Sequence, residues 1–313
     1  MTIPESSIVS VLNHILPQVH EYRAQPEIQQ PPFVVGLTGL QGSGKSTWAN
    51  ALATALQRHG FTVINVSLDD FYLDHDSLVK LREENPDNPL LRTRGQPGTH
   101  DTALISEFFA SLAGSDDIFV PAFDKSKFDG EGDRVPRTQW RRVSPPIDIV
   151  IFEGWCVGFQ PLSIGELTSR WEAERRENLS NVLGDGGMST STLGTHQLSH
   201  LRQINDNLRQ YCNTFMRPTN FHYLIHLDTD DLAHVYLWRI DQERHLRMSS
   251  GHGMSDDAVI RFVQGYMPSY NLFLDRLQRE DFVVRDGHSC HLRLIMDKHR
   301  IVTEQRIGSS PGV

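Results

Sequence analysis

One short segment, residues 39–46, limits what this chain can fold into more than any other part of the sequence. It fits the pattern G-x-x-x-x-G-K-[ST] at every fixed position. Glycines allow tight backbone turns and leave room where phosphate oxygens approach, so that successive backbone N–H groups form an anion-binding nest. A helix that begins near Lys45 adds the positive end of its dipole. The pattern therefore predicts a phosphate-binding loop between a buried strand and a helix.

The residue types of this loop predict ATP and Mg²⁺ as cofactors. The side chain of Lys45 is long enough to reach the β- and γ-phosphates, and the Ser46 hydroxyl can ligate Mg²⁺. The residues that we expect to bind the nucleotide are Gly39, Gln41, Gly42, Ser43, Gly44, Lys45, Ser46 and Thr47.

The sequence around the loop alternates between strand and helix patterns. Residues 33–39 and 61–68 form short apolar runs, and residues 45–59 between them carry apolar side chains at helical spacing. This order predicts a βαβ unit and a parallel sheet. Later apolar runs predict strands at 147–154, 222–228 and 281–286. The expected fold class is α/β, a three-layer α/β/α sandwich of the P-loop NTPase type with a mainly parallel sheet and a helical lid.

We expect residues 1–313 to form a single domain with three accessory parts. Residues 1–32 predict an amphipathic helix and a linker. Residues 180–200 are rich in Gly, Ser and Thr, which favours a mobile insertion at the surface. Residues 236–254 predict the lid, because a helix with several arginines runs there into a segment with two glycines that can act as a hinge.

Composition excludes several classes of function. The net charge of −9 argues against a nucleic-acid-binding protein, which usually has a basic face. No run of about 18 apolar residues is present, so the sequence predicts no membrane span. The three cysteines form no CxxC pair, and the N-terminal residues lack the pattern of a secretory signal. We expect a cytoplasmic protein, with a nuclear location as the alternative, that acts on a small molecule as a monomer or a homodimer.

Carboxylates follow two of the predicted strands, at the edge where open α/β sheets bind ligands. Asp69 and Asp70 come after the second strand, and Glu153 ends the third. Asp69 is the candidate general base, which orients the attacking hydroxyl and accepts its proton. Glu153 and Asp70 are candidates, with Ser46, for holding Mg²⁺ or its water shell. The alternatives are that Asp70 caps the next turn and that both aspartates are solvated in a loop.

Arginines on the predicted lid helix are suited to neutralise the charge that phosphoryl transfer spreads over the phosphate oxygens. Arg239, Arg244 and Arg247 share this helix. Arg239 is the candidate catalytic arginine and acts together with Lys45. Because Arg239 precedes Glu243 by four residues, a surface ion pair between these two side chains is the alternative.

Two charged loop segments are candidates for binding the acceptor of the phosphate. Residues 88–101 contain Arg92 and Arg94, and arginines suit bidentate capture of a carboxylate or a phosphate. Residues 124–134 can supply lysines to the same pocket, Lys125 among them. On composition alone, each segment can equally be a solvated loop.

Several motifs coincide within residues 33–280. They read GLTGLQGSGKST, SLDDFY, NPLLRTRGQPGTHD, PAFDKSKFDGEGDR, VIFEGWCVGF, and YLWRIDQE followed by GMSDDAV and FVQGYMPSY. Together they resemble the ATP-dependent D-glycerate 3-kinase family, whose relatives include plant glycerate kinases and fungal kinase-like homologues. The wider group is the uridine kinase and phosphoribulokinase type of P-loop kinase.

The resemblance implies a P-loop α/β/α sandwich, ATP as phosphate donor, Mg²⁺ as cofactor and 3-phosphoglycerate as product. It matches Asp69 to the acid of a D-x-F-Y signature and Glu153 to the Walker-B acid. It also places Arg94 and His100 in a segment that faces the acceptor. The residues that we expect to bind the acceptor are therefore Asp69, Tyr72, Arg92, Arg94, His100 and Lys125.

The leading expectation is an ATP-dependent kinase that phosphorylates D-glycerate. An alternative within kinases is a nucleoside, pantothenate or another polyol as acceptor. A nucleoside would need an aromatic stacking partner, and Phe71, Tyr72, Phe123 and Phe128 are available. A third hypothesis is a regulatory ATPase, which positions a water molecule in place of an alcohol.

Overall fold

A six-stranded sheet forms the centre of the computed structural model, which describes residues 2–25, 30–180, 188–251 and 253–308. The strand order is β12-β11-β8-β1-β7-β2. All neighbouring strands are parallel except β11 and β12. The strands are β1 (Phe33–Gly39), β2 (Val63–Ser67), β7 (Ile149–Gly154), β8 (Tyr223–Thr229), β11 (His291–Met296) and β12 (Val302–Ile307).

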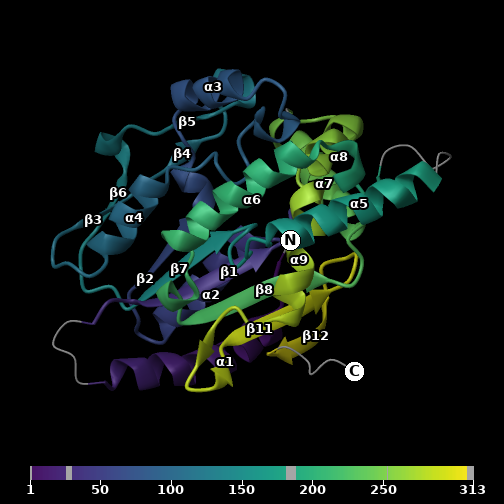
Figure 1. The fold of residues 1–313 in the computed structure, drawn as a ribbon. Helices are drawn as coiled ribbons and strands as arrows, with labels where there is room; N and C mark the ends of the chain where they lie inside the picture. The colour runs from purple at the N-terminus through teal and green to yellow at the C-terminus, as the bar shows by residue number, and fades with distance from the viewer. Residues whose placement is uncertain (1, 26–29, 181–187, 252, 309–313) are drawn as a thin grey trace.

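Helices cover both faces of this sheet, which gives the molecule three layers (Figure 1). They are α1 (Glu5–Arg23), α2 (Lys45–Arg58), α3 (His75–Glu84), α4 (Thr102–Ser111), α5 (Ile164–Ser180), α6 (Leu198–Asn213), α7 (His234–Ser250), α8 (Asp256–Gln264) and α9 (Met267–Arg279). Figure 1 shows α1 below the sheet and α6, α7 and α8 above it. The predicted α/β/α sandwich is confirmed. None of the helices in the described ranges is both long and apolar enough to cross a membrane.

Small antiparallel pairs of strands lie in the loops outside the main sheet. They join β3 (Ile118–Val120) to β6 (Arg141–Val143), β4 (Phe123–Asp124) to β5 (Asp133–Arg134), and β9 (Val284–Arg285) to β10 (His288–Ser289). The hairpin of β4 and β5 carries one of the two predicted acceptor segments.

Four of the predicted strands are present, as β1, β2, β7 and β8, but the prediction of a further sheet strand at 281–286 is wrong. That segment contributes β9 to a small hairpin, because Gly287 has a φ of 78° and turns the chain back. The strand that follows β8 in the sheet is β11 instead. It carries His291 and Arg293 among its apolar residues, which conceals the continuous apolar run typical of a buried parallel strand.

The predicted accessory segments have different outcomes. The N-terminal helix is present as α1, which packs against α2. Part of the predicted linker, residues 26–29, and part of the predicted insertion, residues 181–187, lie outside the described residues. In the described part of the insertion, Leu193 is buried and Thr190 O accepts a hydrogen bond from the Asn271 side chain of α9 at 2.7 Å. This part therefore packs against α9.

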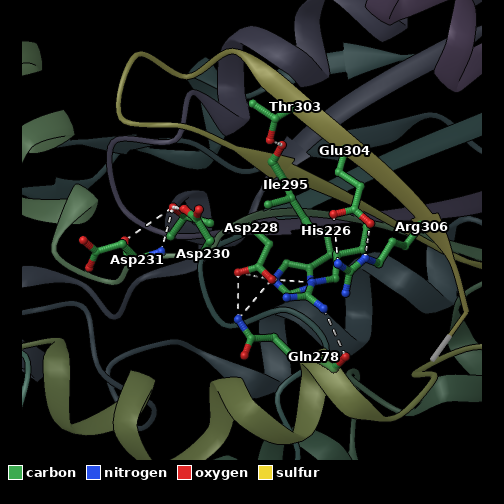
Figure 2. A network of polar contacts seen from close by, with 11 residues as sticks. His226, Asp228, Asp230, Asp231, Gln278, Ile295, Thr303, Glu304 and Arg306 are labelled. Atoms are coloured by element: carbon green, nitrogen blue, oxygen red, sulfur yellow. Dashed lines mark hydrogen bonds and ion pairs between the residues drawn. The ribbon is translucent and has the colours of Figure 1, made fainter. Parts of the chain in front are cut away.

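A buried ionic network joins β8, β11 and α9 (Figure 2). Asp228, fully buried near the end of β8, accepts hydrogen bonds from Arg293 and from the Gln278 side chain, the latter at 3.0 Å to each carboxylate oxygen. His226 Nε2 lies 3.8 Å from Asp228 Oδ1, and the His226 ring stacks on His291 with centroids 5.8 Å apart. The network thus connects β8 and β11 to α9, and removing one partner would leave a buried charge unpaired.

Buried histidines make the fold sensitive to acid. Burial lowers the pKa of His226 to about 4 and that of His291 to about 3. Burial also lowers the pKa of His100 to about 4 and that of the partly buried His222 to about 3. The unfolded chain protonates its histidines near pH ~6.5, so below that pH it binds more protons than the folded protein. The free energy of unfolding therefore falls as the pH drops.

We expect the free energy of unfolding to fall by about 2 kcal/mol for each buried ring between about pH 7 and about pH 5. Asp70, whose pKa burial raises to about 6, and Glu153, whose pKa burial also raises, act in the opposite sense, but they are two groups against these four histidines. Urea unfolding at the two pH values measures the change. In His226→Gln the decrease in the free energy of unfolding should be smaller by the contribution of one ring, about 2 kcal/mol. An equal free energy of unfolding at both pH values would contradict this account.

Candidate active site

The phosphate-binding loop lies between β1 and α2, as the sequence predicts. β1 ends at Gly39, and α2 begins at Lys45 after Gly44, which has a φ of 91°. Gly42 has a φ of 76°, and a Cβ at this position would lie 2.8 Å from the Cβ of Trp238 in α7. A residue with a side chain would be strained here and would collide with α7. The glycines therefore set the shape of the loop, and α7 borders it on one side.

The first residues of α2 meet the acid near the end of β7. The Ser46 hydroxyl donates a hydrogen bond to Glu153 Oε1 at 2.8 Å. Lys45 Nζ donates to the carbonyl oxygens of Gly39 (2.9 Å) and Leu40 (3.1 Å). Burial lowers the pKa of Lys45, against the charge of Glu153, and burial raises the pKa of Glu153, against the charge of Lys45. The oxygens of Ser46 and Glu153 suit a hard cation such as Mg²⁺.

Asp69 and Asp70 follow β2 in a short 3-10 turn (η1, Leu68–Phe71) and have different partners. Asp70 Oδ2 accepts a hydrogen bond from the Ser67 N–H at 3.1 Å, so this carboxylate caps the turn. The alternative that Asp70 caps this turn is therefore the observed contact, and a metal-binding role for Asp70 stays a prediction. Ser67 is opposite Glu153 in the register of β2 and β7, which brings these acids to the same edge of the sheet.

Two side chains hold Asp69. Lys125 Nζ, from the hairpin of β4 and β5, lies 2.5 Å from Oδ2, and the Tyr72 hydroxyl donates a hydrogen bond to Oδ1 at 3.0 Å. Burial acts to raise the pKa of Asp69, but the charge and hydrogen bond of Lys125 outweigh it and hold this pKa below its usual range. Asp69 is therefore ionised at neutral pH, as a proton acceptor must be.

An aromatic wall continues from Tyr72. Its ring stacks on His100 with centroids 4.3 Å apart. The guanidinium of Arg94 lies 5.9 Å from the ring centroid of Tyr72 and 5.5 Å from that of Phe123. Five of the six predicted acceptor residues are thus connected through direct contacts. They are Asp69, Tyr72, Arg94, His100 and Lys125.

The structure does not bring the other two predicted arginines into this group. Arg92 is exposed at the surface, whereas Arg94 lies against the rings of Tyr72 and Phe123. Arg239 pairs with Glu243 at 2.9 Å, and its guanidinium lies 5.2 Å from the ring centroid of Phe262. The ion pair considered as the alternative is therefore the observed contact. A catalytic role for Arg239 requires that it leave Glu243.

The predicted lid corresponds to α7, which is tied to α8. Arg244 and Arg247 both pair with Asp256 in the first turn of α8, at 2.5 and 2.8 Å. Ser255 caps α8 by accepting a hydrogen bond from the Ala258 N–H. Residue 252, within the predicted lid, lies outside the described residues.

Arg300 is a residue of this site that no sequence pattern predicted. It lies in the turn between β11 and β12 with a φ of 62°. Its guanidinium donates hydrogen bonds to Gly42 O (2.7 Å), Trp238 O (2.6 Å) and Asp241 Oδ2 (2.8 Å). No local motif marks this arginine, because its contacts depend on how the sheet places β11 and β12 beside the loop.

A cavity of about 470 Å³ lies beside these contacts. It is lined by Leu237, Trp238, Asp241, Lys298, His299 and Arg300. Because Arg300 and Trp238 both contact Gly42, the cavity opens next to the phosphate-binding loop.

Sequence comparisons place this chain among kinases. The family model described as adenylylsulphate kinase matches residues 31–81, which contain the phosphate-binding loop and Asp69. The uncharacterized kinase mug58 of Schizosaccharomyces pombe is 37% identical, over 94% of this chain and 98% of its own length. The chloroplastic D-glycerate 3-kinase of Arabidopsis thaliana is 30% identical, over 80% of this chain and 49% of its own length.

A solved structure extends the similarity to the whole fold. The D-glycerate 3-kinase from Cryptococcus neoformans var. grubii serotype A is 34% identical and superposes with a TM-score of 0.84. The match covers 96% of this chain and 99% of that protein. The structural similarity therefore extends over nearly the full length of both proteins.

Proposed function

Because the chain belongs to the ATP-dependent D-glycerate 3-kinase family of P-loop kinases, we propose that it transfers the γ-phosphate of ATP to a hydroxyl group of D-glycerate, forming 3-phosphoglycerate. The observation that carries the choice of acceptor is a pair of cations close to Asp69, the proposed general base. Lys125 contacts Asp69, and Arg94 lies over the ring of Tyr72. Cations at this point suit an acceptor with a carboxylate. A nucleoside would need open aromatic faces, and Arg94 lies over the rings of Tyr72 and Phe123.

The donor nucleotide would occupy the loop between β1 and α2. Backbone N–H groups of the loop and the start of α2 suit the phosphates. The adjoining cavity lined by Trp238, Lys298 and Arg300 has the position and volume for the adenine base, at about 470 Å³. Ser46 and Glu153 would hold Mg²⁺, with Asp70 as a further candidate, and the ion would supply positive charge that offsets the negative charge of the phosphates.

Asp69 is the carboxylate at the acceptor end of the site, and its contacts with Lys125 and Tyr72 suit the role of a proton acceptor. Asp69 orients the attacking hydroxyl and accepts its proton as the phosphate is transferred. Lys45 stabilises the charge on the transferred group. When the acceptor binds, Lys125 leaves Asp69 and pairs with the carboxylate of the acceptor, and Arg94 supplies a second cation. This exchange frees Asp69 when an anionic acceptor is bound.

A panel of acceptors tests the proposal. The purified protein is incubated with Mg-ATP and, separately, D-glycerate, L-glycerate, uridine and pantothenate, and ADP release is followed. We expect D-glycerate to give the highest kcat/KM. A higher kcat/KM with uridine or pantothenate would transfer the proposal to that acceptor class. Equal ADP release with every compound and with none would support a regulatory ATPase.

Replacing Lys125 by methionine should impair acceptor binding and shift the pH dependence. Loss of a charge-assisted hydrogen bond should raise the KM for D-glycerate roughly 10- to 100-fold. Without Lys125, burial remains and raises the pKa of Asp69, although Lys45, His100 and Tyr72 still act on it. The acid limb of the kcat/KM profile should therefore move to higher pH.

The matched control is Lys127→Met in the same hairpin. Lys127 pairs with Asp133 at 3.1 Å and has no contact with Asp69. We expect Lys127→Met to leave unchanged both the KM for D-glycerate and the acid limb of the kcat/KM profile. Equal effects of the two substitutions would show that the hairpin as a whole, and not the Lys125 charge, controls acceptor binding.

A further inference from the structure

The side chain of His100 has one defined partner and one free nitrogen beside the proposed base. Its Nδ1 lies 2.8 Å from the Tyr211 hydroxyl of α6, and its ring stacks on Tyr72, which holds Asp69. The other nitrogen, Nε2, is buried and has no hydrogen-bond partner among the described residues. Buried polar atoms are normally paired, so an unpaired one beside a reactive carboxylate points to a ligand.

The Tyr211 hydroxyl determines which nitrogen of His100 carries the proton. Its oxygen accepts hydrogen bonds from the backbone N–H groups of Gly98 (2.7 Å) and His100 (3.2 Å). Burial raises the pKa of Tyr211 well above its usual range, so the phenol keeps its single proton. With both backbone groups acting as donors to the oxygen, that proton points to His100 Nδ1. Nδ1 is therefore the acceptor, and Nε2 carries the ring proton.

The ring is uncharged at neutral pH. Burial lowers the pKa of His100 to about 4, although the charge of Asp69 acts in the opposite direction and that of Lys125 acts with burial. His100 thus offers one N–H group, at Nε2, to its surroundings. The His100 ring stacks on Tyr72, whose hydroxyl donates to Asp69, and this places the ring near the ion pair of Asp69 and Lys125 where the acceptor is proposed to bind. Lys125, which is more than half exposed, is the neighbour able to move away.

We propose that Tyr211 fixes His100 as the Nε2–H tautomer, and that this N–H donates a hydrogen bond to an oxygen of the bound acceptor. The inference rests on the proposed kinase function and goes further, because it gives a chemical requirement for the acceptor. A carboxylate or hydroxyl oxygen at this position is bound, whereas an N–H group there is rejected because two donors would face each other. His100 is then a specificity-determining residue, and Tyr211 is a positioning residue.

Nitrogen NMR tests the tautomer without relying on turnover. Two-bond ¹H–¹⁵N spectra of the ¹⁵N-histidine-labelled protein at about pH 7 distinguish a protonated ring nitrogen from an unprotonated one. The His100 signals are those missing in His100→Gln. We expect a proton on Nε2 and none on Nδ1, and loss of this fixed tautomer in Tyr211→Phe. Tyr236→Phe, which removes a hydroxyl bonded to Ser189 O, should leave the His100 signals unchanged. A proton on Nδ1 in the wild type would overturn the proposal.

Kinetics test the donor role. In His100→Phe, which has no donor, the KM for D-glycerate should rise by about tenfold or more while the KM for ATP stays constant. His100→Gln carries an amide N–H at a comparable reach and should restore most of this loss. If both variants raise the KM equally, or if neither does, the inference is overturned while the kinase function stands. If no acceptor is phosphorylated by the wild type, the proposed function fails, and the acceptor part of this inference fails with it.

Discussion

Asp69→Asn is expected to lower kcat roughly 10²- to 10⁴-fold, the usual contribution of a positioned proton acceptor. Asparagine has the same shape and can still accept the hydrogen bond from Tyr72, but it cannot take the proton of the attacking hydroxyl. The phosphate-binding loop and the pair of Ser46 with Glu153 are untouched. ATP should therefore stabilise the variant against heat as much as it stabilises the wild type.

Asp76→Asn provides the control for this prediction. Asp76 is fully exposed at the start of α3, so its neutralisation should leave kcat unchanged. If Asp69→Asn keeps wild-type kcat, Asp69 is not the proton acceptor. If it also loses the stabilisation by ATP, Asp69 contributes to nucleotide binding, and the assignment of roles along the sheet edge is wrong.

Lys45→Met is expected to lower kcat/KM for ATP roughly 10²- to 10³-fold, because it removes a preorganised donor at the developing negative charge. Methionine is unbranched and fills most of the space of the lysine stem. Lys45 is partly buried and at present donates to the carbonyls of Gly39 and Leu40, so it must turn to the phosphates when the nucleotide binds. The rise in melting temperature on adding ATP should be smaller than in the wild type.

Lys80→Met controls for the loss of a lysine charge. Lys80 is exposed on α3, where it pairs with Glu84 at 3.8 Å. It should keep the wild-type kcat/KM and the stabilisation by ATP. Unchanged kinetics in Lys45→Met would contradict the assignment of residues 39–46 as the phosphate-binding loop.

The features of the fold that follow from a recognised motif or from the parallel arrangement of the strands were predictable. The spacing of Gly39, Gly44 and Lys45 defines a strand, a turn and a helix within a few residues. The contact of Ser46 with Glu153 follows from the loop pattern and from an acid near the end of a strand. The proximity of Asp69 follows from β2 being parallel to β7, since parallel strands end at a common edge.

The long-range contacts of the site were not predictable in the same way. Arg300 reaches Gly42 across 258 positions of the chain, and nothing near Arg300 in the sequence indicates this. The contact of Tyr211 with His100 depends on how α6 packs on the loop before α4. For Arg239, the sequence offered both phosphate and Glu243 as partners, and the side chain pairs with Glu243 in this structure.

Transfer of the phosphate itself tests the central claim most directly. ³¹P NMR of the protein with Mg-ATP and D-glycerate follows ADP, inorganic phosphate and phosphorylated glycerate in one sample. The account predicts that a phosphomonoester signal, identical to that of 3-phosphoglycerate, grows in step with ADP and vanishes in Asp69→Asn. Inorganic phosphate released at the same rate with and without D-glycerate, and no phosphomonoester, would contradict it.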